Sequence, residues 1–279
     1  MLVNLKTVLD MAEKGGFAIP AFNVYNMESV IGVLEAAEEM KAPIIMQVYP
    51  RLMKEQTGYF LSPVIKAAAE RATVPVCFHL DHGPSELETT RSIRYGATGI
   101  MLDGSLLPFE ENIALTKRVV ETCSYLDIQV EGELGHVGMT NDDDMDEFTT
   151  AKDAKRFVEE TGVSCLAVAV GTAHGKYKKP PKLDIERIRE IRESTNNVAL
   201  VLHGGSGVPD EEIKKAVAAG IRKMNFATDI CYAFLDTCLE ELQKPDRPVA
   251  IDTFMKKPIE AVKNFCMTRI KLVGAENRA

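Results

Sequence analysis

The sequence predicts an α/β protein, a single (β/α)8 TIM barrel with parallel strands. Short apolar runs alternate with helical patterns along the 279 residues, and eight such runs can be counted. Apolar strands separated by helices are typical of parallel βαβ units, and eight units fill about this chain length. No Pro/Gly/Ser-rich linker divides the chain, so we expect one domain over residues 1–279.

The expected strands are short apolar runs such as IIMQV and CLAVAV, with polar or turn-forming residues between them. Runs of this kind fit parallel strands that are covered on both faces. In chain order they are Ala18–Phe22, Pro43–Val48, Pro75–Leu80, Thr98–Leu102, Asp127–Glu131, Ser164–Val170, Val198–His203 and Arg222–Phe226.

Amphipathic segments fill the intervals between these runs. The N-terminal MLVNLKTVLDMAEKGG is also interpreted as an amphipathic helix. It is not expected to be a signal peptide, because it lacks an uninterrupted apolar core. The stretch Thr140–Asp146 is too acidic to pack and is predicted to be a mobile loop. The later helices are expected at Ser29–Met40, Pro63–Arg71, Ser85–Tyr95, Phe109–Tyr125, Ala151–Glu160, Asp184–Glu193 and Glu211–Ala219.

Charge and composition narrow the class of protein. The net charge of −8 argues against a nucleic-acid partner, because phosphate backbones attract basic surfaces. No apolar run is long enough to span a bilayer, so no membrane partner is expected. The six cysteines are scattered without a CxxC pair, which favours free thiols in a reducing cytoplasm.

Three of the five histidines lie at the ends of strand-like runs, and each is followed by glycine: His82, His174 and His203. Active sites of such barrels form at the carboxyl ends of the strands. Imidazoles meeting there could bind zinc or a similar metal and leave one position open for substrate. His79 is expected to point away from His82 in an alternating strand, and it could be a core group or a group that supports the metal ligands.

Carboxylates accompany these histidines. Asp81 adjoins His82 and could exchange a proton with a substrate hydroxyl, or it could orient a neighbouring group. Glu131 and Glu133 are two residues apart, so they share one face of a strand. Asp103 and Glu133 could hold a second cation, support the metal ligands or form hydrogen bonds in the barrel mouth.

Glycine-rich and hydroxyl-bearing segments follow the last two strands, where barrels usually bind phosphate. Backbone N–H groups of such turns can hold a phosphate. A phosphate beside a metal that polarises a carbonyl implies a phosphorylated keto substrate. The residues concerned are Gly204, Gly205, Ser206, Asn225, Ala227 and Thr228.

Seven motifs follow one another along the chain: PAFNVYN, HLDHG, MLDGS, EGELG, VAVGTAHGKY, LVLHGGSGVP and KMNFATD. In that order they resemble the class II, metal-dependent ketose-bisphosphate aldolases, the fructose- and tagatose-1,6-bisphosphate aldolase family. The resemblance covers nearly the whole chain up to about residue 235. It implies retro-aldol cleavage of a ketose 1-phosphate or 1,6-bisphosphate to dihydroxyacetone phosphate and an aldehyde, by a homodimer or homotetramer.

The resemblance also implies roles for particular residues. His82, His174 and His203 would bind catalytic zinc, and Asp81 would act on the C4 hydroxyl of the sugar. Asp103 and Glu133 match residues that bind a displaced or second metal, and Asn23 would be a further substrate contact. Main-chain oxygens of Ala173, Gly175 and Gly204 would hold a monovalent cation, Na⁺ or K⁺. The phosphate would be bound by Gly175, Gly204, Ser206, Asn225, Ala227 and Thr228.

The sequence departs from the family pattern at the acceptor end. Asn141 stands where the family's mobile loop carries a proton-transferring glutamate, so Asp142 is the candidate for that role. The C-terminal DPR segment, whose arginine meets the second phosphate, has no clean match. Tyr49 stands near a position where many members have a small hydroxyl residue.

Two other functions stay open at this point. One is a metal-dependent hydrolase on a similar barrel, although such enzymes commonly begin with HxH and this chain has no histidine before His79. The other is a sugar-phosphate-binding homologue with little catalytic activity, which would bind without exchanging a substrate proton.

Overall fold

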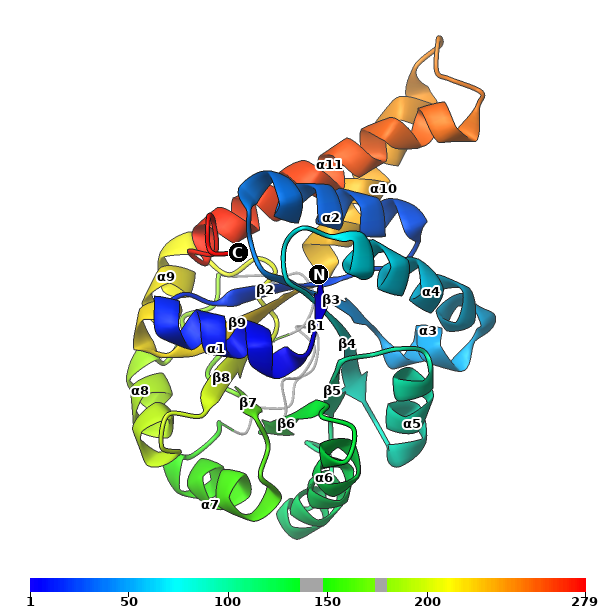
Figure 1. Ribbon diagram of the computed structural model, residues 1–279. Helices are drawn as coiled ribbons and strands as arrows, with labels where there is room; N and C mark the ends of the chain where they lie inside the picture. The colour runs from blue at the N-terminus through cyan, green and yellow to red at the C-terminus, as the bar shows by residue number, and fades with distance from the viewer. Residues whose placement is uncertain (136–147, 174–179) are drawn as a thin grey trace.

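The computed structural model describes residues 1–135, 148–173 and 180–279. Eight parallel strands form a closed barrel surrounded by helices, which confirms the predicted fold (Figure 1). The sheet runs β4-β3-β2-β9-β8-β7-β6-β5, and pairing of β4 with β5 closes it. The barrel strands are β2 (Ile19–Asn23), β3 (Ile44–Val48), β4 (Val76–Gly83), β5 (Gly99–Leu102), β6 (Gln129–Leu134), β7 (Cys165–Val168), β8 (Ala199–Leu202) and β9 (Ile221–Phe226).

Helices cover the outside of the barrel, and most begin within a few residues of the expected positions. One boundary was wrong: a helix was expected from Pro63, but α4 begins at Gln56 and carries Pro63 in its interior. The helices are α1 (Leu5–Gly15), α2 (Met27–Met40), α3 (Pro50–Lys54), α4 (Gln56–Arg71), α5 (Glu86–Arg94), α6 (Phe109–Ser124), α7 (Ala151–Thr161), α8 (Ile185–Ser194), α9 (Asp210–Ala219), α10 (Thr228–Gln243) and α11 (Ile251–Leu272).

The N-terminal segment closes the amino end of the barrel. A short strand, β1 (Leu2–Val3), pairs with the start of β4 at Val76 and Cys77. Helix α1 follows and buries Leu5 and other apolar side chains against this end. The predicted N-terminal helix is therefore confirmed from Leu5 onward, and it leaves the carboxyl ends of the strands uncovered.

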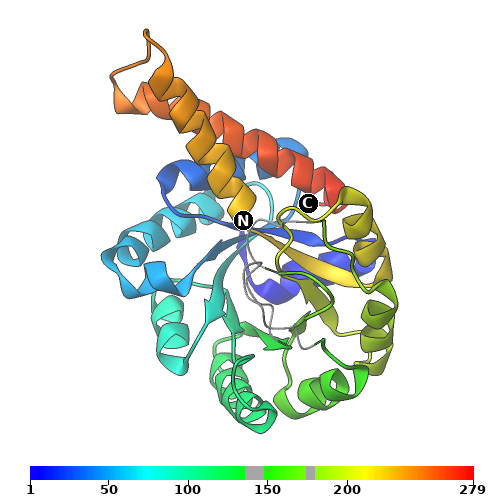
Figure 2. The same ribbon diagram turned by 180° about the vertical axis from the view of Figure 1, so that it is seen from behind.

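Two C-terminal helices that the sequence did not predict extend the barrel. Helix α11 packs along α2, and Lys263 Nζ of α11 lies 2.7 Å from Glu39 Oε2 of α2. Figures 1 and 2 show the outer ends of α10 and α11 projecting away from the barrel. Each of the two helices therefore has one half that packs on the rest of the protein and one half that projects beyond it.

The core lies inside the barrel and between the barrel and its helices, and it is mostly apolar. The six cysteines are free thiols, and four of them are buried. Among the described residues, no helix combines the length and the apolarity needed to cross a bilayer. Polar side chains that are buried inside the barrel gather toward the carboxyl ends of the strands.

Candidate active site

The structure brings most of the predicted site residues to the carboxyl end of the barrel. Three of the predicted residues, Asp142, His174 and Gly175, lie outside the described residues. The others come from the ends of six strands and the turns that follow. They are Asn23 on β2, Asp81 and His82 on β4, Asp103 after β5, Glu133 on β6, His203, Gly204 and Ser206 after β8, and Asn225, Ala227 and Thr228 at the end of β9 and the start of α10.

His82 reaches the site through an unusual backbone conformation. Strict alternation would place Asp81 and His82 on opposite faces of β4. Instead, the pairing of β4 with β5 shifts register after Leu80, and His82 adopts a left-handed φ of 47°. The expectation that His79 points away from His82 is therefore wrong, because both rings face the carboxylates of β6 inside the barrel.

His82 and His203, the two described histidines of the predicted zinc site, are each held by a carboxylate at one ring nitrogen. Nδ1 of His82 lies 2.7 Å from Oδ2 of Asp103, and Nε2 of His203 lies 2.9 Å from Oε1 of Glu131. Metal-binding histidines usually donate their second nitrogen to such a partner, which fixes the ring and its tautomer. The other nitrogen of His203, Nδ1, lies 3.2 Å from Glu133 Oε2, and the centroids of the two rings are 4.6 Å apart.

The donor set fits a divalent metal. Ligand atoms of Asp81, His82 and His203 lie within 4.8 Å of one another, and so do those of His82, Asp103 and Glu133. Nitrogen and carboxylate oxygen donors suit zinc and similar ions. Asp103 thus holds His82 and also belongs to the second group, so both roles that the sequence left open for it are compatible with its position.

The electrostatics of the site favour a cation. Burial by itself would lower the pKa of His82, but Asp81, Asp103 and Glu133 raise it to about 10. Burial would also raise the pKa of Asp81, yet His82 and His203 hold it below its ordinary value. The acidic groups therefore stabilise positive charge at the place where the imidazoles meet.

Two amides donate hydrogen bonds to Asp81. Asn23 Nδ2 lies 2.8 Å from its Oδ2, and Asn225 Nδ2 lies 3.1 Å from its Oδ1. Each amide oxygen in turn accepts a hydrogen bond, from Gln47 Nε2 at 2.8 Å and from Lys223 Nζ at 2.7 Å. Asp81 is therefore held from both sides as a buried carboxylate.

The sequence reasoning missed Gln47 and Lys223. For Lys223 a signal was present, because it lies two residues before Asn225 on the same strand, and residues with this spacing share a face. Only Met224 separates the two in IRKMNF, and both point into the barrel. A lysine inside an apolar strand is rare unless it is paired, which would have marked it as part of the site.

A small cavity of about 30 Å³ opens beside Asp81. Gly204 at its wall has a left-handed φ of 64°, and a Cβ there would collide with the carbonyl oxygen of Ala173. The backbone N–H groups at the start of α10, near Thr228, face the same region, and helix N-termini attract anions. The cavity is lined by Asn23, Tyr49, Asp81, Gly204, Gly205, Ser206, Asn225, Ala227 and Thr228.

The structure modifies one expectation for this cavity. Asn225 was expected to bind phosphate, but its side-chain amide is engaged by Asp81 and Lys223. Ser206 stays close to the start of α10, because its Oγ accepts a hydrogen bond from Asp229 N at 3.3 Å. The described phosphate-binding candidates that line the cavity without contacting Asp81 are Gly204, Ser206, Ala227 and Thr228.

Two tyrosines and one arginine lie at the side of the cavity where the aldehyde half of the substrate is expected. The Tyr49 ring lies 5.7 Å from the His82 ring, and burial with nearby acids raises the pKa of Tyr49 to about 12. The guanidinium carbon of Arg51 lies 5.9 Å and 5.5 Å from the ring centres of Tyr25 and Tyr49. Arg51 therefore places a positive charge next to the wall of the cavity.

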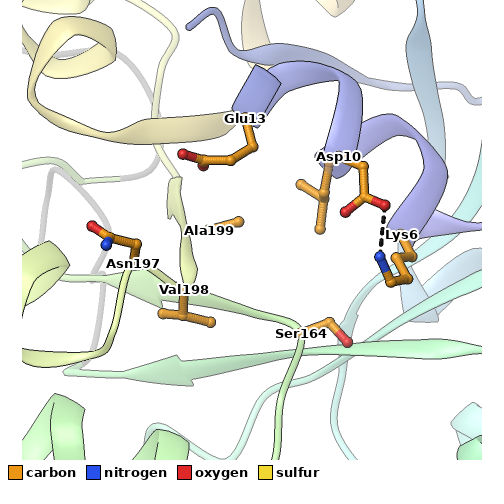
Figure 3. A pocket seen from close by; sticks show the side chains of 8 residues that line it. Lys6, Asp10, Glu13, Ser164, Asn197, Val198 and Ala199 are labelled. Atoms are coloured by element: carbon orange, nitrogen blue, oxygen red, sulfur yellow. Dashed lines mark hydrogen bonds and ion pairs between the residues drawn. The ribbon is translucent and has the colours of Figure 1, made fainter. Parts of the chain in front are cut away.

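A second hollow lies at the opposite end of the barrel and is shown in Figure 3. It encloses about 280 Å³ between α1 and the residues that precede β7 and β8, among them Ser164 and Asn197. Its most prominent polar contact is an ion pair between Lys6 Nζ and Asp10 Oδ2 at 2.6 Å. Because catalytic groups of such barrels lie at the carboxyl ends of the strands, this hollow is not the active site.

A closed barrel with imidazoles and carboxylates at its carboxyl end, grouped so that they could hold a metal ion beside a glycine-lined cavity, is an arrangement typical of barrel enzymes. A family model for class II fructose-bisphosphate aldolase matches residues 3–278. The chain therefore belongs to the class II fructose-bisphosphate aldolase family, and its fold and family are those of aldolases, a class of lyases.

Solved structures agree with this assignment. The YdjI aldolase from Escherichia coli K12 is 35% identical with a TM-score of 0.90, and the match covers 100% of both chains. A putative fructose-1,6-bisphosphate aldolase from Coccidioides immitis is 27% identical, covering 98% and 96% of the two chains, with a TM-score of 0.87. The fructose-bisphosphate aldolase of Campylobacter jejuni, 24% identical over 100% and 97% of the chains with a TM-score of 0.83, shares the fold.

Proposed function

We propose that this protein is a zinc-dependent aldolase that reversibly cleaves a ketose 1-phosphate or 1,6-bisphosphate. The products are dihydroxyacetone phosphate and an aldehyde. The observation that carries the proposal is the convergence of Asp81, His82 and His203, whose ligand atoms lie within 4.8 Å beside a glycine-lined cavity. His174, which the resemblance makes the third zinc ligand, completes the proposed set.

In this mechanism, bound zinc would polarise the C2 carbonyl and stabilise the negative charge that develops on it. Asp81 accepts the proton of the C4 hydroxyl as the carbon–carbon bond breaks. Asn23 and Asn225 hold Asp81 ionised and correctly oriented, because each donates a hydrogen bond to one of its oxygens. Gly204, Ser206 and the start of α10 bind the phosphate and thereby position the substrate.

Further assignments accompany the proposal. Gly204 approaches the main-chain oxygen of Ala173 closely, which supports a monovalent cation beside the phosphate. Asp142 is proposed to handle the proton at C3 in place of the family's loop glutamate. We further propose that the protein acts in the cytoplasm on small sugar phosphates, as a homodimer or homotetramer.

Arg51 supports an acceptor half that carries an anionic group. Its guanidinium is held over Tyr25 and Tyr49, and Tyr49 lines the cavity with Asp81. A guanidinium is a good partner for phosphate or carboxylate, because its planar fork matches their oxygens. Ketose 1,6-bisphosphates are therefore expected to be cleaved with a lower KM than the corresponding 1-phosphates.

The first test is exchange of the C3 proton of dihydroxyacetone phosphate with D₂O, followed by NMR. Zinc-loaded protein is expected to exchange this proton, and protein treated with a chelator is not. The second is cleavage of fructose and tagatose 1-phosphates and 1,6-bisphosphates, followed by the dihydroxyacetone phosphate released. A zinc-loaded protein that neither exchanges nor cleaves is not an aldolase of this kind.

The variant Asp81→Asn separates the two half-reactions. An amide of the same shape cannot accept the C4 hydroxyl proton, so kcat for cleavage should fall about 10²- to 10⁴-fold. Exchange at C3 should persist, because that proton is assigned to another group. Equal loss of both reactions would contradict the role of Asp81. Release of inorganic phosphate instead would favour a hydrolase.

A further inference from the structure

Lys223 is a fully buried lysine on β9 that lies beneath the active site. Its Nζ is 2.8 Å from Glu131 Oε2 and 2.7 Å from Asn225 Oδ1. It is not among the described residues that line the cavity beside Asp81. Lys223 therefore has no direct access to a substrate in that cavity, and any effect on the reaction must pass through the two groups that it contacts.

The ammonium group determines which way the Asn225 amide points. A lysine ammonium has three donors and no acceptor, so the amide atom that faces it must be the oxygen. The amide nitrogen then faces Asp81 Oδ1, at 3.1 Å, and a carboxylate can only accept. A reversed amide would place a donor against the ammonium and an acceptor against the carboxylate, so both contacts would become repulsive.

The other amide has a weaker anchor. Gln47 Nε2 donates to Asn23 Oδ1 at 2.8 Å, but Gln47 is itself an amide that can present either end. Its Oε1 is buried and has no hydrogen-bond partner among the described residues, so no described contact opposes a turn of the Gln47 side chain. Of the two amides that hold Asp81, Asn225 is therefore the one kept in a single orientation by a group that only donates hydrogen bonds.

The second contact of Lys223 leads to a predicted metal ligand. Glu131 uses Oε2 for Lys223 and Oε1 for His203 Nε2, so one carboxylate joins the lysine to the imidazole. His79, which is also buried, lies 3.5 Å from Glu131 Oε2. The lysine thus supports Asp81 on one side and His203 on the other.

We propose that Lys223 is a positioning residue of the aldolase reaction, which fixes the Asn225 amide toward Asp81 and holds Glu131 against His203. The inference rests on the proposed function, because it assigns Asp81 the proton transfer. Lys223 forms no bond with the substrate and transfers no proton. Through the Asn225 amide, it keeps Asp81 in one orientation before the substrate binds.

The test needs a variant that removes the ammonium without leaving a lone buried charge. Lys223→Met alone would leave Glu131 as a buried carboxylate without its lysine partner, which is strongly destabilising. The double variant Lys223→Met/Glu131→Gln removes both charges and nearly conserves the volume. The glutamine side chain that replaces Glu131 keeps an oxygen that can accept from His203 Nε2, so the imidazole retains a partner.

For this double variant we expect kcat for cleavage of fructose 1,6-bisphosphate, or of tagatose 1,6-bisphosphate, to fall about 10- to 100-fold. This range corresponds to a hydrogen bond to a charged group. The KM should change less than about threefold, because Gly204, Ser206 and Thr228 do not contact Lys223. Zinc content per chain, measured by mass spectrometry, should match the wild type.

A matched control separates positioning from general loss of stability. Ile188→Ala removes buried volume from α8, on the outside of the barrel, and Ile188 belongs to none of the strands that carry Asp81 and its two amides. It should lower the melting temperature and leave kcat within about threefold of the wild type. If it lowers kcat as much as the double variant does, the positioning role is wrong.

A double-mutant cycle shows whether Lys223 acts through Asn225. In an Asn225→Ala background, Lys223→Met/Glu131→Gln should lower kcat by less than about threefold, because the amide that Lys223 orients is absent and the glutamine side chain still accepts from His203 Nε2. Losses that simply multiply would overturn the inference. So would a double variant with the kcat of the wild type.

A spectroscopic readout decides the inference without any substrate. The side-chain amide protons of Asn225, assigned by their disappearance in Asn225→Ala, should shift in ¹H–¹⁵N spectra of the double variant as donation to Asp81 is lost. Unchanged amide resonances would overturn the positioning role even in an inactive protein. Wild-type protein that cleaves neither sugar would overturn the proposed function but leave this result standing.

Discussion

At the scale of single residues, His82 and His203 each have a close carboxylate partner at one ring nitrogen. Asp103 holds Nδ1 of His82 at 2.7 Å, and Glu131 holds Nε2 of His203 at 2.9 Å. Ser105 in turn donates to Asp103 through its hydroxyl at 2.7 Å, so this carboxylate is itself fixed. The second nitrogen of each ring is thereby aimed before any ion binds, which lowers the cost of metal binding.

Asp103→Ala should therefore weaken zinc binding about 10- to 100-fold, the usual cost of losing the partner that orients a metal-binding histidine. Competition with a chromophoric chelator measures the change. The control Asp10→Ala removes an exposed carboxylate at the opposite end of the barrel and should not alter the affinity. Unchanged affinity in Asp103→Ala would show that His82 does not need this partner.

The stoichiometry in the same experiment separates the two roles of Asp103. If the group of His82, Asp103 and Glu133 holds a second ion, Asp103→Ala should remove one bound metal per chain. If Asp103 only orients His82, the number of ions should stay the same while the affinity falls. The loss of affinity without loss of an ion is the result we expect, because Asp103 is already engaged with His82.

Some residues of the site could be predicted from the sequence, and others could not. Histidines and acids at strand ends carry recognisable chemistry, so Asp81, His82 and His203 could be chosen before the structure was seen. The side chain of His82 reaches the site only because of its left-handed backbone, which no alternation rule contains. Lys223 was missed because its importance lies in contacts across the barrel, and sequence spacing does not specify those contacts.

At the scale of elements, α2 and α11 share the most extensive contact between two helices in the described part of the chain. Gly32 of α2 faces this contact, and a Cβ there would lie 2.8 Å from the Ile259 carbonyl oxygen and 2.9 Å from Val262 Cγ1. The first of these atoms is backbone and cannot rotate away. The separation of the two helices therefore depends on the missing side chain of Gly32.

Gly32→Ala should destabilise the protein by about 1–3 kcal/mol, because it overpacks this contact. The gain in helix propensity from alanine, up to about 1 kcal/mol, would offset only part of the loss. Urea denaturation of the metal-free protein measures the difference. Lys117→Ala, an exposed change on α6 and away from the α2–α11 contact, is the control and should stay within about 0.5 kcal/mol of the wild type. A stabilised Gly32→Ala would contradict the packing argument.

The strands were easier to predict than the helices, for a physical reason. A parallel strand inside a barrel is covered on both faces, so it forms a short apolar run such as IIMQV, now seen as β3. The start of α4 was misplaced because proline favours the first turn of a helix, whereas Pro63 lies in the interior of α4. Helices α10 and α11 were not predicted, since part of their apolar surface faces solvent rather than a core.

At the scale of the whole molecule, the closed barrel makes residues that are far apart in sequence into neighbours. Asp81 on β4 meets Asn225 on β9, which is 144 residues away in the chain, at 3.1 Å. The carboxyl ends of all parallel strands share one rim, so any strand can contribute to one site. This geometry is why the order of motifs in the sequence was enough to predict a common site, while its individual contacts were not.

The projecting part of α10 predicts self-association. Tyr232, Leu235, Leu239 and Leu242 are spaced by three, four and three residues, the pattern of an a/d seam between packed helices. All four are exposed, by 46%, 61%, 58% and 55%, although the adjoining half of the helix packs on the barrel. An apolar stripe of this regularity in water is unfavourable unless another surface covers it.

We expect the protein to form a homodimer or homotetramer in which α10 of one copy covers this stripe on another, because the spacing suits a second helix. The double variant Leu235→Glu/Leu239→Glu places charges on the seam and should give monomers in sedimentation velocity at micromolar concentration. Lys244→Glu, a charge change near the end of the same helix but off the seam, is the control and should keep the wild-type state. A wild-type protein that sediments as a monomer at these concentrations would contradict the prediction, and a variant that stays associated would move the interface elsewhere.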